Sequence, residues 1–287
     1  MPPFVYYSNA CRQPVGSPLL RARDIMSMTV WNWVLAACVA AVLVVFVRPD
    51  DAGADSSRLD RLLKAYPDHL ERIDGNTLIW RNGTRMSLDD GRGAKSFEDW
   101  LRDPDIEDML AQPYPRGGSA SPPARNSDPG RARNAAFFKT MYGDCTKDEV
   151  ARRLVDVIWL PKKAGQRLKV TTVNNVAARL EAVSRELDAL PARFDVYLAP
   201  SAGAYNCRPI AGTSQLSAHG YGIAIDIALK HADYWRWSKS TAGGQLPYRN
   251  AIPLEIVRIF EKHGFIWGGA WYHYDTMHFE YRPELLQ

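Results

Sequence analysis

Two short segments of this chain carry the residue types of a metal-dependent hydrolase. Residues 217–226 read SAHGYGIAID, and residues 275–280 read DTMHFE. Two histidines and one carboxylate are the ligand set of a catalytic zinc that keeps its fourth position for water. We therefore expect His219, Asp226 and His278 to bind one zinc ion.

Two predicted strands would bring these ligands together. Residues 222–228 alternate, so that three isoleucines face the core and Asp226 points the other way. Residues 277–281 alternate as well and place His278 on one face, while His219 lies in the turn before the first strand. An unpaired buried charge is costly. A shared metal ion would give all three side chains a partner.

Two further acidic residues flank the second histidine. Asp275 lies three residues before His278, where it can reach metal-bound water without binding the metal. Zinc lowers the pKa of its water to about 7, and a nearby carboxylate can pass that proton to a leaving amine. We expect Asp275 to be this general base and Glu280 to hold His278 in one tautomer. The alternative is that the histidines are ordinary core residues and Asp226 caps a turn; four residues at these spacings favour the metal site.

Overall charge argues against a nucleic-acid partner. The chain has 287 residues and a net charge of +4, from 36 basic and 32 acidic side chains. No run of lysines and arginines forms a basic stripe. Apolar residues make up 46% and charged residues 24%, the ordinary values of a globular protein. We expect a monomer that binds no nucleic acid.

Residues 28–47 are the one long apolar stretch of the sequence. Three arginines and only one acidic residue precede it. Positive charge before an apolar run holds the N-terminus in the cytoplasm and sends the downstream chain across the membrane. About 20 such residues span a bilayer. Because small residues follow at 52–54, the stretch is either a cleaved signal peptide or an anchor in the inner membrane. Either way, we expect the catalytic region outside the cytoplasm: periplasmic, secreted or anchored to the cytoplasmic membrane.

The four cysteines divide between the two sides of that stretch. Cys11 and Cys38 lie before or within it, whereas Cys145 and Cys207 lie in the part that we expect to be exported. An oxidising compartment favours pairing of the second two. The alternative is two separate buried thiols. We expect a disulfide between Cys145 and Cys207.

Periodicity outside the motifs predicts helices mixed with short strands. In the N-terminal half we expect helices over residues 55–72 and 96–111 and a hairpin over residues 77–88. Asn82-Gly83 at the hairpin tip is typical of a type I′ turn, which needs positive φ at both residues. After these, we expect helices over residues 150–158, 173–190 and 253–262 and strands over residues 168–171 and 194–199.

This mixture is typical of the α+β class. We expect a small, mainly antiparallel sheet that is flanked by helices and carries the zinc site. The capping box TKDE at residues 146–149 would begin the first of the later helices, and Thr172 would cap the second.

Composition divides the chain into four parts. Residues 1–54 form a tail that contains the apolar stretch, and residues 55–112 form a small helix–hairpin–helix region. Residues 113–134 are rich in Pro, Gly, Ser and Arg, which predicts a linker. Residues 135–287 form the catalytic domain. The region 55–112 would either cover the groove or space the catalytic domain from the membrane.

Two patterns in the chain resemble the signature of the M15 zinc peptidases: S-x-H-x-x-G-x-A-x-D at residues 217–226 and D-x-x-H-x-E at residues 275–280. The flanking FIWGG at residues 265–269 and Trp271 are similar to the carboxypeptidase-like branch. The resemblance covers roughly residues 136–286. It implies a fold like that of hedgehog and D-Ala-D-Ala peptidase domains, one zinc ion, and peptidoglycan stem peptides as substrates. The family includes D-alanyl-D-alanine carboxypeptidases and dipeptidases and L-alanyl-D-glutamate endolysins.

The resemblance also implies individual roles. His219, Asp226 and His278 match the zinc ligands, and Asp275 matches the general base. Many members have Glu at the base position, and Asp is similar to the endolysin-like branch. This leaves the cleaved bond open between D-Ala-D-Ala and L-Ala-D-Glu. Members carry an arginine before the first motif, and Arg208 is its counterpart, expected to bind the polarised carbonyl or a substrate carboxylate. The alternative for Arg208 is a structural ion pair.

Three more side chains are candidates for substrate contact. Ser217 would either hydrogen-bond substrate or cap its turn, and Trp271 and Tyr272, which flank the base, would line a groove. We therefore expect an extracytoplasmic zinc metallopeptidase that cuts stem peptides. Two alternatives stay open: a zinc-containing wall-binding module without activity, and a peptidase that acts on exported proteins.

Overall fold

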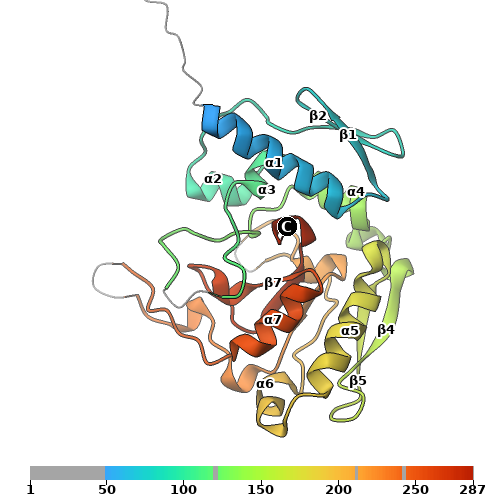
Figure 1. Cartoon of the computed structure of the whole chain (residues 1–287), viewed down its shortest axis with the longest axis vertical. Helices are drawn as coiled ribbons and strands as arrows, with labels where there is room; N and C mark the ends of the chain where they lie inside the picture. The colour runs from blue at the N-terminus through green and yellow to red at the C-terminus, as the bar shows by residue number, and fades with distance from the viewer. Residues whose placement is uncertain (1–48, 119–121, 211–212, 241–243, 287) are drawn as a thin grey trace, which may run out of the picture. The chain divides into compact units, whose positions relative to one another are not determined.

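Small antiparallel sheets and the helices around them make up the fold in the computed structural model (Figure 1). The structure describes residues 49–118, 122–210, 213–240 and 244–286. The first sheet has the order β1 (Leu70–Asp74), β2 (Thr77–Trp80), β3 (Arg85–Ser87). The second pairs β4 (Leu154–Trp159) with β5 (Gln166–Thr171). The third has the order β6 (Ala224–Asp226), β8 (His278–Tyr281), β7 (Phe265–Trp267). The fold is α+β, as the sequence predicted.

Helices pack on these sheets from several sides. Those of the first half are α1 (Pro49–Ala65), α2 (Phe97–Arg102), α3 (Ile106–Leu110) and α4 (Ala135–Tyr142). Those of the second half are α5 (Val176–Asp188), α6 (Asp195–Leu198) and α7 (Leu254–Lys262). Helix α5 packs on β4 and β5, and α7 packs on β7 (Figure 1). Among the described residues, none of the helices is both long and apolar enough to cross a bilayer. The apolar stretch 28–47 lies outside the described residues.

The third sheet separates the core from the residues of the two motifs. Strands β6 and β8 pair so that Asp226 lies opposite His278. On the other face, Phe279 of β8 stacks on Phe260 of α7, with ring centroids 3.8 Å apart. Cross-strand neighbours lie within side-chain reach of each other. The register therefore brings the two motifs together while the apolar face is buried.

The predicted hairpin is confirmed, but its turn differs. Of the two tip residues, Gly83 alone has a positive φ, 84°, so the turn is not type I′. The backbone N–H of Gly83 donates to Trp80, and that of Trp80 donates to Thr84, at 2.9 Å each. This pattern fits a three-residue loop with a left-handed glycine.

Two predicted elements are wrong because long-range pairing overrides local periodicity. Residues 150–158 do not form a helix: Leu154–Trp159 pairs with β5 along its whole length and buries Val157 and Trp159 completely. Two short 3-10 helices precede this strand: Cys145–Lys147, which a left-handed Asp148 ends at φ 57°, and Ala151–Arg153. The segment 194–199 is not a strand, because Asp195–Leu198 forms helix α6. Their two buried residues, Phe194 and Leu198, are four apart, a spacing that a helix satisfies.

Three predicted helices exist with different limits. Helix α1 begins before residue 55 and ends at Ala65, and β1 follows. The segment 96–111 is interrupted between α2 and α3, at a proline. Helix α5 begins only at Val176, because Asn175 is left-handed. Thr172 does not cap it, since its hydroxyl donates to the carbonyl of Arg153 at 3.2 Å.

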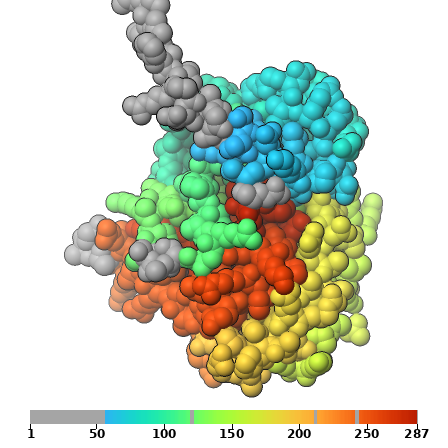
Figure 2. Space-filling model, viewed as in Figure 1, coloured from blue at the N-terminus to red at the C-terminus, as the bar shows by residue number. Residues whose placement is uncertain are grey.

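The segment predicted as a linker lies on the C-terminal half of the fold (Figure 2). The Tyr114 hydroxyl donates to Glu261 at 2.8 Å. The His273 N–H donates to Asp128 at 2.9 Å. The described residues from 49 to 286 belong to one compact unit. The predicted limits of the four parts of the chain stay predictions.

Candidate metal centre and active-site pocket

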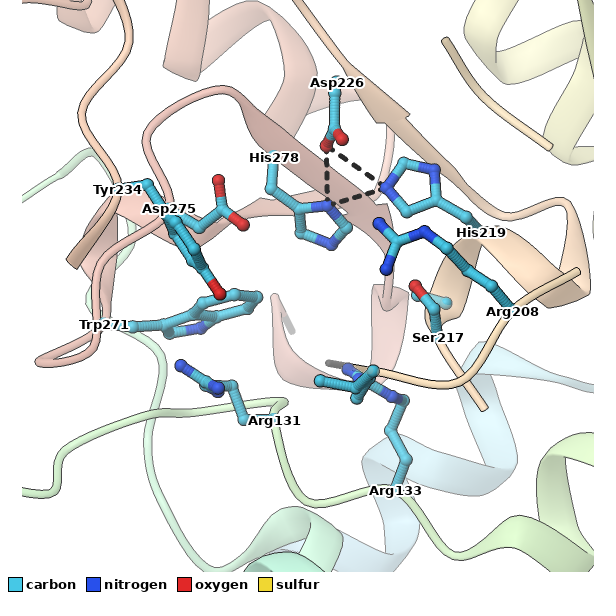
Figure 3. A pocket seen from close by; sticks show the side chains of 12 residues that line it. Arg131, Arg133, Arg208, Ser217, His219, Asp226, Tyr234, Trp271, Asp275 and His278 are labelled. Atoms are coloured by element: carbon cyan, nitrogen blue, oxygen red, sulfur yellow. Dashed lines mark hydrogen bonds and ion pairs between the residues drawn. The ribbon is translucent and has the colours of Figure 1, made fainter. Parts of the chain in front are cut away.

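Three side chains of the two motifs converge on one point (Figure 3). The Asp226 Oδ1 atom lies 3.2 Å from His219 Nε2 and 2.9 Å from His278 Nδ1. The two ring nitrogens lie 3.2 Å apart. Two imidazole nitrogens and a carboxylate oxygen in this arrangement can hold a metal ion.

Local backbone geometry brings His219 to the paired strands. It lies in a 3-10 turn, Ala218–Tyr221, that Gly222 ends with a left-handed φ of 70°. A Cβ atom at Gly222 would come within 2.8 Å of Leu154 and 3.1 Å of the Thr171 backbone. Only glycine suits both the conformation and the space. This turn lets the chain enter β6 with His219 beside Asp226.

The outer nitrogen of each histidine already has a partner. His219 Nδ1 contacts the carbonyl oxygen of Ala204, and His278 Nε2 lies 3.0 Å from a carboxylate oxygen of Glu280. Both partners are acceptors, so each outer nitrogen carries the proton. The inner nitrogens then direct their lone pairs at the cluster, as metal ligation requires.

Electrostatics of the cluster favour a cation. Burial lowers the pKa of His278, but its hydrogen bonds to Asp226 and Glu280 raise it to about 10. Burial opposes ionisation of Asp226, yet His219 and His278 hold the pKa of its carboxyl far below the usual range. The carboxylate is therefore ionised. A proton on His278 Nδ1 and a metal ion compete for the same lone pair.

This cluster lines a pocket with about 580 Å³ of open space (Figure 3). The other lining residues come from distant parts of the chain: Arg131, Arg133, Arg208, Ile210, Ser217, Ala218, Tyr234, Trp271 and Asp275. Of the expected site residues, Arg208, Ser217, Trp271 and Asp275 thus share the pocket with the cluster. Tyr272 lines a neighbouring pocket instead.

Asp275 is the carboxylate that faces the cluster from the side (Figure 3). Its Oδ1 atom is buried and has no hydrogen-bond partner. Burial raises the pKa of Asp275 to about 6, although His278 lowers it. A carboxyl group with a pKa near the working pH is suited to accept and return a proton.

Arg208 and Ser217 lie on the opposite side of the cluster from Asp275 (Figure 3). The Ser217 N–H donates to the Arg208 carbonyl at 3.0 Å. The Ser217 hydroxyl does not cap its turn. Among the described residues, no ion pair holds Arg208. A disulfide joins Cys145 to Cys207, the residue before Arg208, and fixes this loop to the 3-10 turn that follows α4.

Sequence reasoning missed Arg131, Arg133 and Tyr234 as pocket residues. The two arginines end the segment predicted to be a linker. The available signal was their spacing: two cations separated by one residue, directly before the predicted catalytic domain. Arg133 is buried and its Nη1 lies 3.0 Å from Glu280. Only the fold of residues 122–134 over the pocket reveals their proximity.

A second acidic group, Asp89, Asp90 and Asp105, has the donor types of a metal site. Its centre already holds a cation, because Lys95 Nζ lies 2.8 Å from Asp90 and 2.9 Å from Asp105. Burial lowers the pKa of Lys95, but its hydrogen bonds to these carboxylates and to Asp108 together raise it above the usual value. We therefore assign this acidic cluster a structural role, because two of its carboxylates are ion-pair partners of Lys95.

A His–Asp–His cluster with a neighbouring carboxylate, here on an α+β fold, is typical of metal-dependent hydrolases. The family model described as D-alanyl-D-alanine carboxypeptidase matches residues 211–281, a stretch that contains the cluster and Asp275. The match supports the resemblance of this region to the M15 peptidases. No curated protein and no solved structure matches the chain.

Proposed function

We propose that the chain is a zinc-dependent peptidase that hydrolyses peptide bonds in peptidoglycan stem peptides. The observation that carries this proposal is the pairing of a preformed ligand cluster with one buried, unpartnered carboxylate oxygen in the same pocket. The family match supports a peptidase that acts on peptidoglycan-related material.

The donor set fits zinc. Two histidine nitrogens and one carboxylate oxygen leave a fourth position open, as in catalytic zinc sites. His219, Asp226 and His278 would hold the ion, and the fixed outer nitrogens support them. When bound, zinc supplies a Lewis acid that activates water and polarises a carbonyl.

The chain's own residues would move the proton and stabilise charge. Asp275 Oδ1 accepts the proton of the attacking water and returns it to the leaving amine nitrogen. The Arg208 guanidinium stabilises the negative charge that develops on the substrate carbonyl oxygen. Trp271, buried in the pocket wall, limits access of bulk water on the Asp275 side.

The proposal includes a compartment. An extracytoplasmic domain, periplasmic or secreted or held by residues 28–47, would meet stem peptides directly. The disulfide between Cys145 and Cys207 supports an oxidising compartment. We propose that the domain acts there as a monomer.

Digestion of purified sacculi tests the function. The zinc-loaded protein should release peptides, and their masses, measured by mass spectrometry, name the bond that is cut. Chelator-treated protein is the control. Tight binding to sacculi without any released product would favour the wall-binding module over the peptidase. Cleavage of casein with no action on sacculi would redirect the proposal to exported proteins.

A further inference from the structure

The wall of the pocket outside the family-matched region is basic. Arg131 and Arg133 come from the segment before α4, whereas the family match covers residues 211–281. Figure 3 shows both side chains across the pocket from the ligand cluster. Neither arginine takes part in the proposed hydrolysis, although Arg133 Nη1 also pairs with Glu280.

The surrounding chain holds this segment firmly in place. Asp128, which is fully buried, accepts from the His273 N–H at 2.9 Å and contacts His273 Nδ1 at 2.6 Å. Pro129 accepts a hydrogen bond from Trp271 Nε1 at 2.7 Å. A Cβ atom at Gly130 would lie 2.5 Å from Ile266. Such close fixation is typical of a positioned site rather than of a linker.

Each arginine keeps hydrogen-bonding capacity for a ligand. Arg131 Nη1 donates to the His273 carbonyl at 2.9 Å, and its guanidinium lies 5.4 Å from the Trp271 ring centroid. Within the described part of the chain, no carboxylate forms an ion pair with Arg131. Arg133 uses Nη1 toward Glu280 and Gly130, and its Nε is buried without a partner.

Charge in the pocket would favour an anion once the cluster holds a metal ion. Arg133 is paired with Glu280, whereas the other two lining arginines, Arg131 and Arg208, lie in the pocket with two carboxylates, Asp226 and Asp275. A divalent cation on the cluster would therefore give the pocket a positive excess. Guanidinium groups bind carboxylates through short, charge-assisted hydrogen bonds that are about twice as strong as neutral ones. An apolar or cationic substrate group would leave these donors unpaired in a largely buried place.

We propose that Arg131 and Arg133 form a carboxylate-binding subsite that selects substrates with a free carboxylate next to the cleaved bond. This inference rests on the proposed function and assigns its substrate preference to a segment outside the family signature. The carboxylate has two possible sources: the C-terminus of the peptide, which would make the protein an exopeptidase, or an acidic residue within it. Arg208 keeps its proposed role of stabilising charge on the substrate carbonyl oxygen.

The test compares matched peptides that differ in one charge. The substrates are a stem pentapeptide with a free C-terminus, the same peptide with a C-terminal amide, and one with its internal acidic group amidated. We expect zinc-loaded wild type to prefer the free acid at one of these positions. Arg131→Gln should reduce that preference in kcat/KM about tenfold to a hundredfold. Arg131→Lys should keep part of the preference, and zinc content should not change.

Arg193→Gln is the matched control, since Arg193 is exposed and contacts Phe194 away from the pocket. Equal loss on acid and amide substrates in Arg131→Gln would overturn the inference. Which amide is rejected identifies the source of the carboxylate.

Direct binding separates this inference from the proposed function. Calorimetry with the free-acid and amide peptides measures recognition even if no bond is cut. Discrimination by wild type that is lost in Arg131→Gln supports the subsite without any turnover. Equal affinity of wild type for acid and amide would refute it.

Discussion

Two acidic side chains flank His278: Glu280 is surrounded by cationic partners, whereas Asp275 has an oxygen without any partner. Glu280 is fully buried and lies within 3.2 Å of Arg133, Arg282 and His278. Asp275 has one buried oxygen with no partner. Burial would raise both pKa values, but the neighbouring cations hold the pKa of Glu280 far below its usual range. The pKa of Asp275 rises to about 6.

The different surroundings of Glu280 and Asp275 suit them to different roles, one structural and one in proton transfer. A carboxylate that is paired on all sides cannot take up a proton without breaking buried ion pairs. A carboxylate with a free oxygen and a raised pKa can exchange a proton near neutral pH. Glu280 therefore holds His278, whereas Asp275 keeps one oxygen without a partner, as the proposed general base requires.

The ion pairs and hydrogen bonds around Glu280 extend to the end of the N-terminal helix α1. Arg282 contacts both Glu280 and Glu284, and the Tyr66 hydroxyl, just after α1, donates to Glu284 at 2.7 Å. All of these side chains are nearly or fully buried. The chain of polar contacts links the N-terminal region to the strand that carries His278. The segment 55–112 thus contributes to the support of the site.

Loss of the free carboxylate should give the largest effect on turnover. Asp275→Asn removes the proton acceptor, so kcat should fall by about 10²- to 10⁴-fold, measured on released stem peptides. Stability in urea and zinc content should stay near the wild-type values. Asp68→Asn, at an exposed position, is the control. Unchanged kcat in Asp275→Asn would remove it from the mechanism.

Loss of the paired carboxylate should act mainly on stability. Glu280→Gln leaves Arg133 and Arg282 as buried cations without their shared partner, which should lower the free energy of unfolding by about 3–5 kcal/mol. Urea denaturation measures this change. Glu181→Gln removes a surface pair with Arg185 and should change stability by less than about 1 kcal/mol. Similar values for the two variants would contradict the structural role of Glu280.

Acid should lower activity through Asp275, the carboxylate with the raised pKa. The base must be deprotonated, and its pKa is raised, so kcat/KM should fall as pH decreases through about 6. A bound cation lowers this pKa, which places the acid limb at or below about pH 6. Well below that pKa the rate should fall about tenfold per pH unit, as for any single essential base. An acid limb well above pH 6 would point to another group.

The sequence predicted the ligand cluster because its geometry is local to two strands. Alternation in β6 and β8 places Asp226 and His278 on chosen faces, and glycines mark the turn that carries His219. It did not predict Arg131 and Arg133, because their place in the pocket depends on how residues 122–134 fold over β8.

The wrong elements have a similar cause. Residues 150–158 contain apolar spacings that suit a helix, yet pairing of β4 with β5 decides their conformation. Residues 194–199 alternate in polarity, but Phe194 and Leu198 also lie one helical turn apart. Short segments with two acceptable periods are settled by tertiary packing, which no local pattern contains.

All of the proposed roles depend on one proposal, that the His–Asp–His cluster is a catalytic zinc site. The most direct test titrates zinc into chelator-treated protein and follows metal bound and stem peptide released in the same samples. We expect one zinc per chain, with activity rising in proportion to occupancy up to one equivalent, and no binding in His219→Ala. Peptide release that is independent of zinc, or stoichiometric zinc binding in His219→Ala, would contradict the assignment of this cluster as a catalytic zinc site.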